Sequence, residues 1–135
     1  MHLICVTLRF SAAHKLELHP GKCSRLHGHT WKAGAVIYGE TLADDGMLLD
    51  FEELKSMLRA ATSDLDHAYL NELESFREIQ PTAENVARLI FQRLKGLLEV
   101  HENVNGVRLA SVFVQESPDT YAIYNEGSNL FLIPE

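Results

Sequence analysis

Strand-like apolar segments lie near both ends of the chain, and the pattern changes to a helical period in its middle. Residues 3–11 and 27–40 are rich in β-branched and other apolar side chains, which favours an extended strand in each segment. The segment between them, residues 12–26, contains Pro20 and Gly21 and is predicted as a loop. The first third of the chain therefore predicts two long strands joined by a loop.

Two amphipathic helices are predicted next. Asp50, followed by Glu53, forms a capping pattern at the start of the first helix. Its apolar positions recur at spacings of four, three and four: Leu54, Leu58, Ala61 and Leu65. The second helix follows Pro81, with Thr82 near its cap. Its apolar positions are Val86, Ile90, Leu94 and Leu97.

Strand character returns after Gly106. Residues 107–116 and 120–124 are predicted as strands, and residues 129–133 as a further short one. The order ββααββ indicates an α+β fold, in which two helices cover one face of an antiparallel sheet. Because no repeat or linker interrupts the pattern, residues 1–135 are interpreted as a single domain. The tail, residues 127–135, receives no functional assignment.

Composition narrows the classes of function. The 135 residues are 46% hydrophobic, which is enough for one core. The 12 Lys and Arg against 19 Asp and Glu give a formal net charge of −7, which argues against nucleic acid or an anionic membrane as the main partner. The first residues lack the regions typical of a signal peptide, so we expect a cytoplasmic protein. Both cysteines, Cys5 and Cys23, are then expected to be free thiols.

A cluster of metal-binding residue types lies at the start of the second predicted strand. Cys23, His27 and His29 fall within seven residues, and His14 ends the preceding apolar stretch. Side chains two apart in a strand project to the same side, so His27 and His29 would present both rings to one point. Three imidazoles around Zn²⁺ leave a fourth position open, as in catalytic zinc sites. The cluster therefore predicts a reactive metal site, although imidazoles also bind other divalent ions.

Six ordered motifs run through most of the chain: FSAAH (10–14), CSRLHGH (23–29), GMLLDF (46–51), LDH (65–67), PTAEN (81–85) and VQE (114–116). Together they resemble the family of 6-pyruvoyl-tetrahydropterin and 6-carboxy-tetrahydropterin synthases. The resemblance implies the tunnelling fold (T-fold), in which subunits combine their sheets into a β-barrel. It also implies a homo-oligomer, typically a hexamer of two trimers, with active sites between subunits.

The resemblance also implies a role for each site residue. His14, His27 and His29 are expected to bind one Zn²⁺ per subunit, which would make protons on a bound pterin side chain easier to remove. Cys23 is expected to be the catalytic base, since a thiol near zinc can have a lowered pKa. The remaining expected site residues are the Asp66–His67 dyad for proton transfer, Glu116 as the anchor of the pterin ring, and Thr82 as a pterin contact.

Simpler interpretations of these residues remain open from the sequence alone. Asp66 and His67 are also typical of a structural charge pair at the end of a helix. Glu116 is also consistent with a solvated acid at the end of a strand. Thr82 is also consistent with a helix cap and no other role.

The spacing of the metal motif favours one branch of the family. Three residues separate Cys23 from His27, which is similar to the bacterial 6-carboxy-tetrahydropterin synthases. That resemblance implies conversion of 7,8-dihydroneopterin triphosphate to 6-carboxy-5,6,7,8-tetrahydropterin, with loss of triphosphate and acetaldehyde, in queuosine biosynthesis. The alternatives are 6-pyruvoyl-tetrahydropterin synthase activity, a zinc hydrolase and a non-catalytic paralogue. The nearby cations Lys15, Lys22, Arg25 and Lys32 are candidates for contact with the triphosphate.

Overall fold

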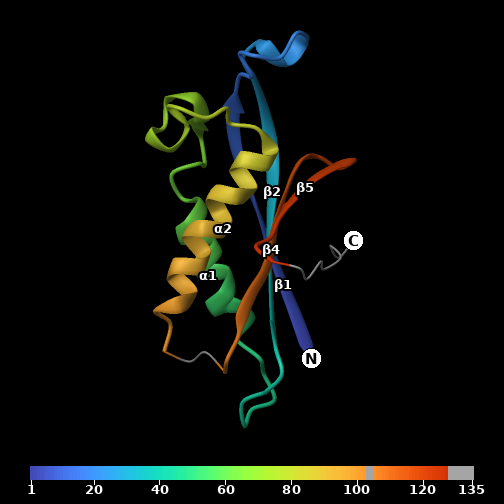
Figure 1. Ribbon diagram of the computed structural model, residues 1–135, viewed down its shortest axis with the longest axis vertical. Helices are drawn as coiled ribbons and strands as arrows, with labels where there is room; N and C mark the ends of the chain where they lie inside the picture. The colour runs from blue at the N-terminus through green and yellow to red at the C-terminus, as the bar shows by residue number, and fades with distance from the viewer. Residues whose placement is uncertain (103–104, 128–135) are drawn as a thin grey trace.

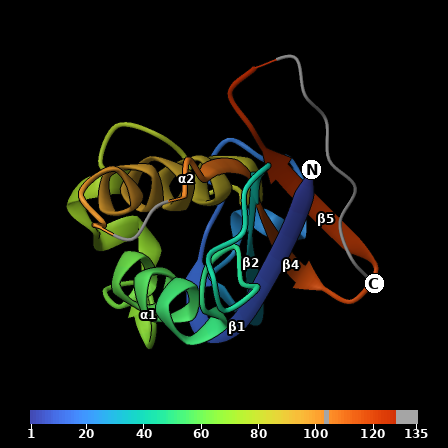
Figure 2. The same ribbon diagram turned by 90° about the horizontal axis from the view of Figure 1, so that it is seen from below.

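A five-stranded sheet carries two helices on one of its faces (Figures 1 and 2). The computed structural model describes residues 1–102 and 105–127. The elements in chain order are β1 (His2–His14), β2 (His27–Gly39), α1 (Phe51–Thr62), β3 (Ala68–Tyr69), α2 (Ala83–Glu99), β4 (Arg108–Ser117) and β5 (Thr120–Tyr124). Three short 3-10 helices, η1 (Lys22–Ser24), η2 (Leu70–Glu72) and η3 (Glu74–Phe76), lie in the connections. The spatial order of the strands is β3-β1-β2-β4-β5, with only the β1–β3 pair parallel.

Both helices begin at the predicted caps. The Asp50 carboxylate accepts the amide N–H of Glu52 at 2.7 Å, and the Thr82 hydroxyl accepts that of Asn85 at 3.2 Å. These bonds satisfy N–H groups that the first turn of a helix leaves without an internal partner. The helices therefore start where the sequence indicated.

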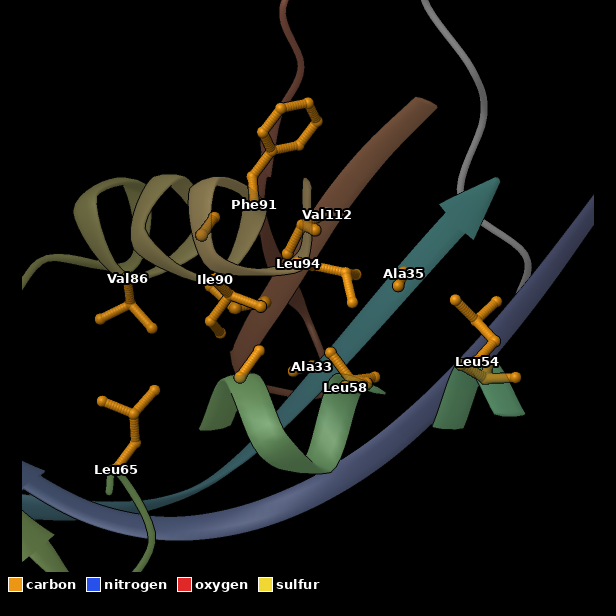
Figure 3. Close-up of a cluster of buried hydrophobic side chains, with 14 of the residues drawn as sticks. Ala33, Ala35, Leu54, Leu58, Leu65, Val86, Ile90, Phe91, Leu94 and Val112 are labelled. Carbon is orange, nitrogen blue, oxygen red and sulfur yellow. The ribbon is translucent and has the colours of Figure 1, made fainter. Parts of the chain in front are cut away.

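The main hydrophobic core fills the space between the helices and the sheet. Figure 3 shows side chains from both helices meeting over Ala33 and Ala35 of β2. All predicted apolar positions of the first helix are buried, although Leu65 lies in the turn beyond the end of α1. In α2 the first three predicted positions are buried, the last, Leu97, is partly buried against the core, and the unpredicted Leu98 is buried beside it.

The β1–β2 pair is longer than the sequence predicted. Its register runs from His2 opposite Gly39 to His14 opposite His27. The predicted loop was therefore wrong for residues 12–14, which belong to β1. Ala12 and Ala13 have weak strand propensity, but they pair with β2 on one side and with the unpredicted β3 on the other. Tertiary pairing thus extends β1 as far as the candidate metal ligand His14.

The α+β class and the order of the predicted elements are confirmed, with β3 as an addition. The strand predicted at residues 129–133 lies outside the described residues. Within the described part of the chain, no helix combines the length and the apolar character needed to cross a membrane.

The sheet face turned away from the helices carries a second, smaller apolar cluster. Val36, Ala110 and Phe113 are buried there. Gly34 of β2 lies under the Phe113 ring, and a Cβ atom at this position would be 2.1 Å from the ring Cζ. Only a residue without a side chain fits beneath Phe113 at this point.

Candidate metal centre and active site

The three predicted ligands converge at one end of the β1–β2 pair. His14 lies directly opposite His27, and His29 follows two residues later, so all three project from the same face. Their ligand atoms all lie within 4.8 Å of one another, and no other group of this kind occurs in residues 1–102 and 105–127. The same row of β2 continues into Trp31, which is fully buried and packs against the rings of His14 and His29. The cluster is therefore an extension of the helix-facing core.

Backbone carbonyls orient two of these rings. The Nδ1–H of His14 donates to the carbonyl oxygen of Pro81 at 2.7 Å, and that of His27 donates to the carbonyl oxygen of Arg25 at 2.7 Å. A ring that donates through Nδ1 presents its Nε2 atom to the cluster, and carbonyl partners of this kind commonly orient metal-binding histidines.

The chemistry of the cluster fits a bound divalent cation. The Nε2 atoms of His14 and His29 are buried, and no described protein group hydrogen-bonds to either. Buried polar atoms without partners are rare in proteins because each forfeits its interaction with water. Three nitrogen donors directed to one point would remove that deficit by binding a metal such as zinc.

Burial favours the neutral form of two candidate ligands, His14 and His29. Desolvation lowers the pKa of His14 and of His29 below the ordinary value of 6.5, and the nearby Glu116 carboxylate opposes this shift only in part. Because a metal ligand must be unprotonated, both rings are ready to bind a cation near neutral pH.

Glu116 lies beside the cluster on the neighbouring strand. Its carboxylate oxygens are 3.7 Å from Nε2 of His14 and 3.8 Å from Nε2 of His29. It follows Val112 and Val114, which are buried on the helix-facing side of β4, so alternation directs Glu116 to the same side. Its side chain is 28% exposed. The structure thus brings Glu116 to His14 and His29 and does not show a freely solvated acid.

Asp66 and His67 form a contacting pair at the edge of β1. An Asp66 carboxylate oxygen accepts the Ser11 amide N–H at 2.9 Å and lies 3.0 Å from Nδ1 of His67. The hydrogen bond from Ser11 is the main cause that lowers the pKa of Asp66. The pair lies beyond the end of α1, tied to the sheet, which is not the arrangement of a helix-terminal charge pair.

A hollow of about 600 Å³ adjoins this pair. Its lining includes His67, Tyr69 and His29. It also includes Ser11 and Thr30, which alternate along β1 and β2 with the residues of the metal cluster and therefore face the opposite side of the sheet. The dyad therefore borders the outer face of the sheet, near one candidate ligand.

Cys23 lies apart from the metal cluster within one copy of the chain. It belongs to η1, in a connection that projects past the ends of β1 and β2 (Figure 1). Cys23 is half-buried and, like Cys5, is a free thiol in the described chain. It is not a member of the group whose atoms are close enough to hold an ion.

Two residues that anchor the Cys23 connection were missed in the sequence. The Asn71 side chain accepts the N–H of Lys15 at 2.9 Å and donates to its carbonyl at 2.8 Å. The Gln80 side chain accepts the N–H of Glu17 at 3.0 Å. Contacts between a side chain and backbone more than 50 residues away leave no periodic signal in a sequence.

Thr82 is placed at the N-terminus of α2, immediately after Pro81. Its hydroxyl caps the helix, which accounts for the residue without a ligand. Contact between Thr82 and a pterin remains a prediction.

Comparison with known proteins agrees with this architecture. The chain is 35% identical over 122 residues to a 6-carboxy-5,6,7,8-tetrahydropterin synthase of Bacillus subtilis, covering 87% of this chain and 80% of the relative. It is 32% identical over 148 residues to the protein of the same name from Haemophilus influenzae, covering 93% of this chain and all of the relative.

A solved structure has the same fold. The 6-pyruvoyl tetrahydropterin synthase of Caenorhabditis elegans superposes with a TM-score of 0.80 at 28% identity, covering 93% of this chain and 96% of that one. This agreement confirms the T-fold class. The family model for 6-pyruvoyl tetrahydropterin synthase matches residues 3–127, and the chain belongs to that family.

Proposed function

We propose that this protein is a zinc-dependent 6-carboxy-5,6,7,8-tetrahydropterin synthase. It would convert 7,8-dihydroneopterin triphosphate to the 6-carboxy product, with release of triphosphate and acetaldehyde, and would act in queuosine biosynthesis. The observation that carries the proposal is the convergence of His14, His27 and His29 beside the Glu116 carboxylate. Relatives named 6-carboxy-5,6,7,8-tetrahydropterin synthase, from Bacillus subtilis and Haemophilus influenzae, support the choice within the family.

The three histidines would hold one zinc ion per subunit through their nitrogen atoms. When bound, zinc supplies Lewis acidity to the hydroxylated side chain of the pterin. The carbonyls of Pro81 and Arg25 keep the His14 and His27 rings in the orientation that presents Nε2. Nitrogen donors favour zinc over magnesium or calcium, which prefer oxygen.

Glu116 would orient the substrate. A carboxylate can accept two parallel N–H bonds from the amino-pyrimidinone edge of a pterin, and these bonds fix both position and angle. Because Glu116 lies beside the histidines, a pterin held there would place its side chain near the metal ligands. Thr82, whose hydroxyl already caps α2, is proposed as a further contact to the ring.

Cys23 and the Asp66–His67 pair would move protons. Cys23 would act as the base, and Asp66 would orient His67 and stabilise its protonated form, since their side chains lie 3.0 Å apart. In one copy of the chain, Cys23 lies in the projecting connection and the Asp66–His67 pair lies at the edge of β1. Neither belongs to the metal cluster. We propose that neighbouring copies complete each site.

The sheet offers edges for such an assembly. Within the described residues, β3 pairs with β1 only at Ala12 and Ala13, and β5 forms the opposite edge of the sheet. Unpaired strand edges readily accept a strand from another chain. We propose that copies join through these edges into a β-barrel, and that two trimers form a hexamer.

The triphosphate would be bound by local cations. Lys15, Lys22 and Arg25 lie in the connection that carries Cys23, and Lys32 lies on β2. Replacing Lys22 and Arg25 together should raise KM and weaken its dependence on salt. Unchanged kinetics would remove these two residues from the proposal.

A Cys23→Ala variant tests the mechanism. In a cysteine-dependent synthase, this variant loses most of its release of triphosphate and acetaldehyde but retains zinc. A hydrolase that uses metal-bound water would keep substantial activity, and that result would contradict the proposal. Wild-type protein that binds zinc but leaves the substrate intact would instead indicate a non-catalytic paralogue.

A further inference from the structure

Arg93 of α2 joins three separate segments through one guanidinium group. Its Nη1 donates to the carbonyl of Ala61 at 3.1 Å and to Oδ1 of Asp64 at 2.6 Å. Its Nη2 donates to Oδ2 of Asp64 at 3.0 Å and to the hydroxyl of Ser75 at 3.2 Å. A single side chain therefore links α2 to the end of α1, to the turn that follows α1, and to η3.

The turn held by Arg93 is the one that presents the Asp66–His67 pair. Only Leu65 separates Asp64 from Asp66, and its side chain is completely buried. His67 has a φ of +57°, which places its backbone in the left-handed region. This conformation is unfavourable for a residue with a Cβ atom, and it persists where surrounding contacts hold it in place.

The contacts that hold His67 come from two directions. On the sheet side, its amide donates to the carbonyl of Ser11 at 2.6 Å, and the Ser11 amide donates to Asp66 at 2.9 Å. On the helix side, Arg93 fixes Asp64 through two parallel bonds, which set the angle of the carboxylate as well as its distance. The left-handed backbone of His67 is thus held by β1 on one side and by the Arg93–Asp64 ion pair, the clamp, on the other.

We propose that Arg93 is a positioning residue that holds the Asp66–His67 pair in its working geometry. This inference rests on the proposed function, because it takes the pair to transfer protons. Lysine would not replace arginine here, because it lacks the planar fork that engages both carboxylate oxygens.

The ion pair between Arg93 and Asp64 is partly exposed, so its effect on the turn can be distinguished from an effect on the stability of the whole protein. The side chains are 29% exposed in Arg93 and 47% exposed in Asp64, so removing either one leaves no fully buried charge without a partner. Loss of the clamp is therefore expected to leave the protein folded and to loosen only the turn.

The test compares Arg93→Met with Lys95→Met, a control on the same helix that removes the ion pair between Lys95 and Glu126. Hydrogen exchange of the His67 and Ser11 amides is measured by NMR in zinc-loaded protein. In Arg93→Met, both amides are expected to exchange about tenfold faster or more, while amides of the β2–β4 ladder keep their wild-type rates. Lys95→Met is expected to exchange like the wild type at all of these amides.

Kinetics of the same variants supply the second readout. The kcat of Arg93→Met for dihydroneopterin triphosphate is expected to fall by about tenfold to a hundredfold, with KM and zinc content unchanged. Arg93→Lys is expected to resemble Arg93→Met. Asp64→Asn, at an exposed position, is expected to reproduce the local change and serves if Arg93→Met does not fold.

Two results would overturn the inference: wild-type exchange at His67 and Ser11 in both Arg93→Met and Asp64→Asn, or faster exchange with unchanged kcat. If the wild-type protein shows no synthase activity, the proposed function fails. The exchange rates would still report whether Arg93 holds the turn.

Discussion

The Nδ1 atom of His14 donates a hydrogen bond to the carbonyl oxygen of Pro81 at 2.7 Å, which connects a candidate metal ligand on β1 to the residue before the N-cap of α2. The same helix holds the turn that carries Asp66 through the side chain of Arg93. α2 and the residue before its N-cap therefore support both the metal cluster and the dyad, although they supply none of their side chains.

Thr82→Ala removes the N-cap of α2 and is expected to lower the free energy of unfolding by about 1 kcal/mol. The reason is that the Asn85 amide loses its partner in the hydroxyl of Thr82. Urea denaturation measures the change. Thr82→Ser keeps a hydroxyl and should retain most of the stability, so equal losses in both variants would show that the cap is not the cause.

Metal-free protein is expected to lose stability as pH falls from about 7 to 5. Burial lowers the pKa of His14 and His29 below 6.5 in the folded chain, so the unfolded chain binds more protons in this range. The stability that depends on both rings being neutral is fully present above pH 6.5 and is lost progressively below it. Unfolding curves across this range, for wild type and for His14→Gln, measure the effect.

His14→Gln should show a smaller change of stability with pH, because one of the two buried imidazoles is absent. A slope equal to that of the wild type would mean that His14 does not contribute to the pH dependence.

Gly34→Ala is expected to destabilise the sheet by about 1–3 kcal/mol, the usual cost of forcing extra volume into a packed site. The added Cβ atom would lie 2.1 Å from the Phe113 ring, so either the ring or β2 must move. Combining Gly34→Ala with Phe113→Leu should recover part of the loss. Strictly additive losses in the double variant would contradict the predicted clash.

Much of the fold could be predicted because it depends on local patterns. The caps at Asp50 and Thr82 and the periodic apolar positions predicted both helices. Alternation in the second strand predicted that His27 and His29 share a face, and the structure confirms that arrangement.

The contacts that depend on distant segments could not be predicted. Pairing with β2 and β3, which follow later in the sequence, extends β1 through residues 12–14. The bond from Ser11 to Asp66 joins residues 55 apart, and the clamp from Arg93 to Asp64 joins residues 29 apart. Neither bond produces a spacing or a composition that a single sequence reveals.

The most direct test of the proposed function is mass spectrometry of the products formed from 7,8-dihydroneopterin triphosphate by zinc-loaded protein, with acetaldehyde assayed in parallel. The proposal predicts a 6-carboxy pterin and an equal amount of acetaldehyde. A 6-pyruvoyl product without acetaldehyde would contradict it and assign the chain to the other activity of the family.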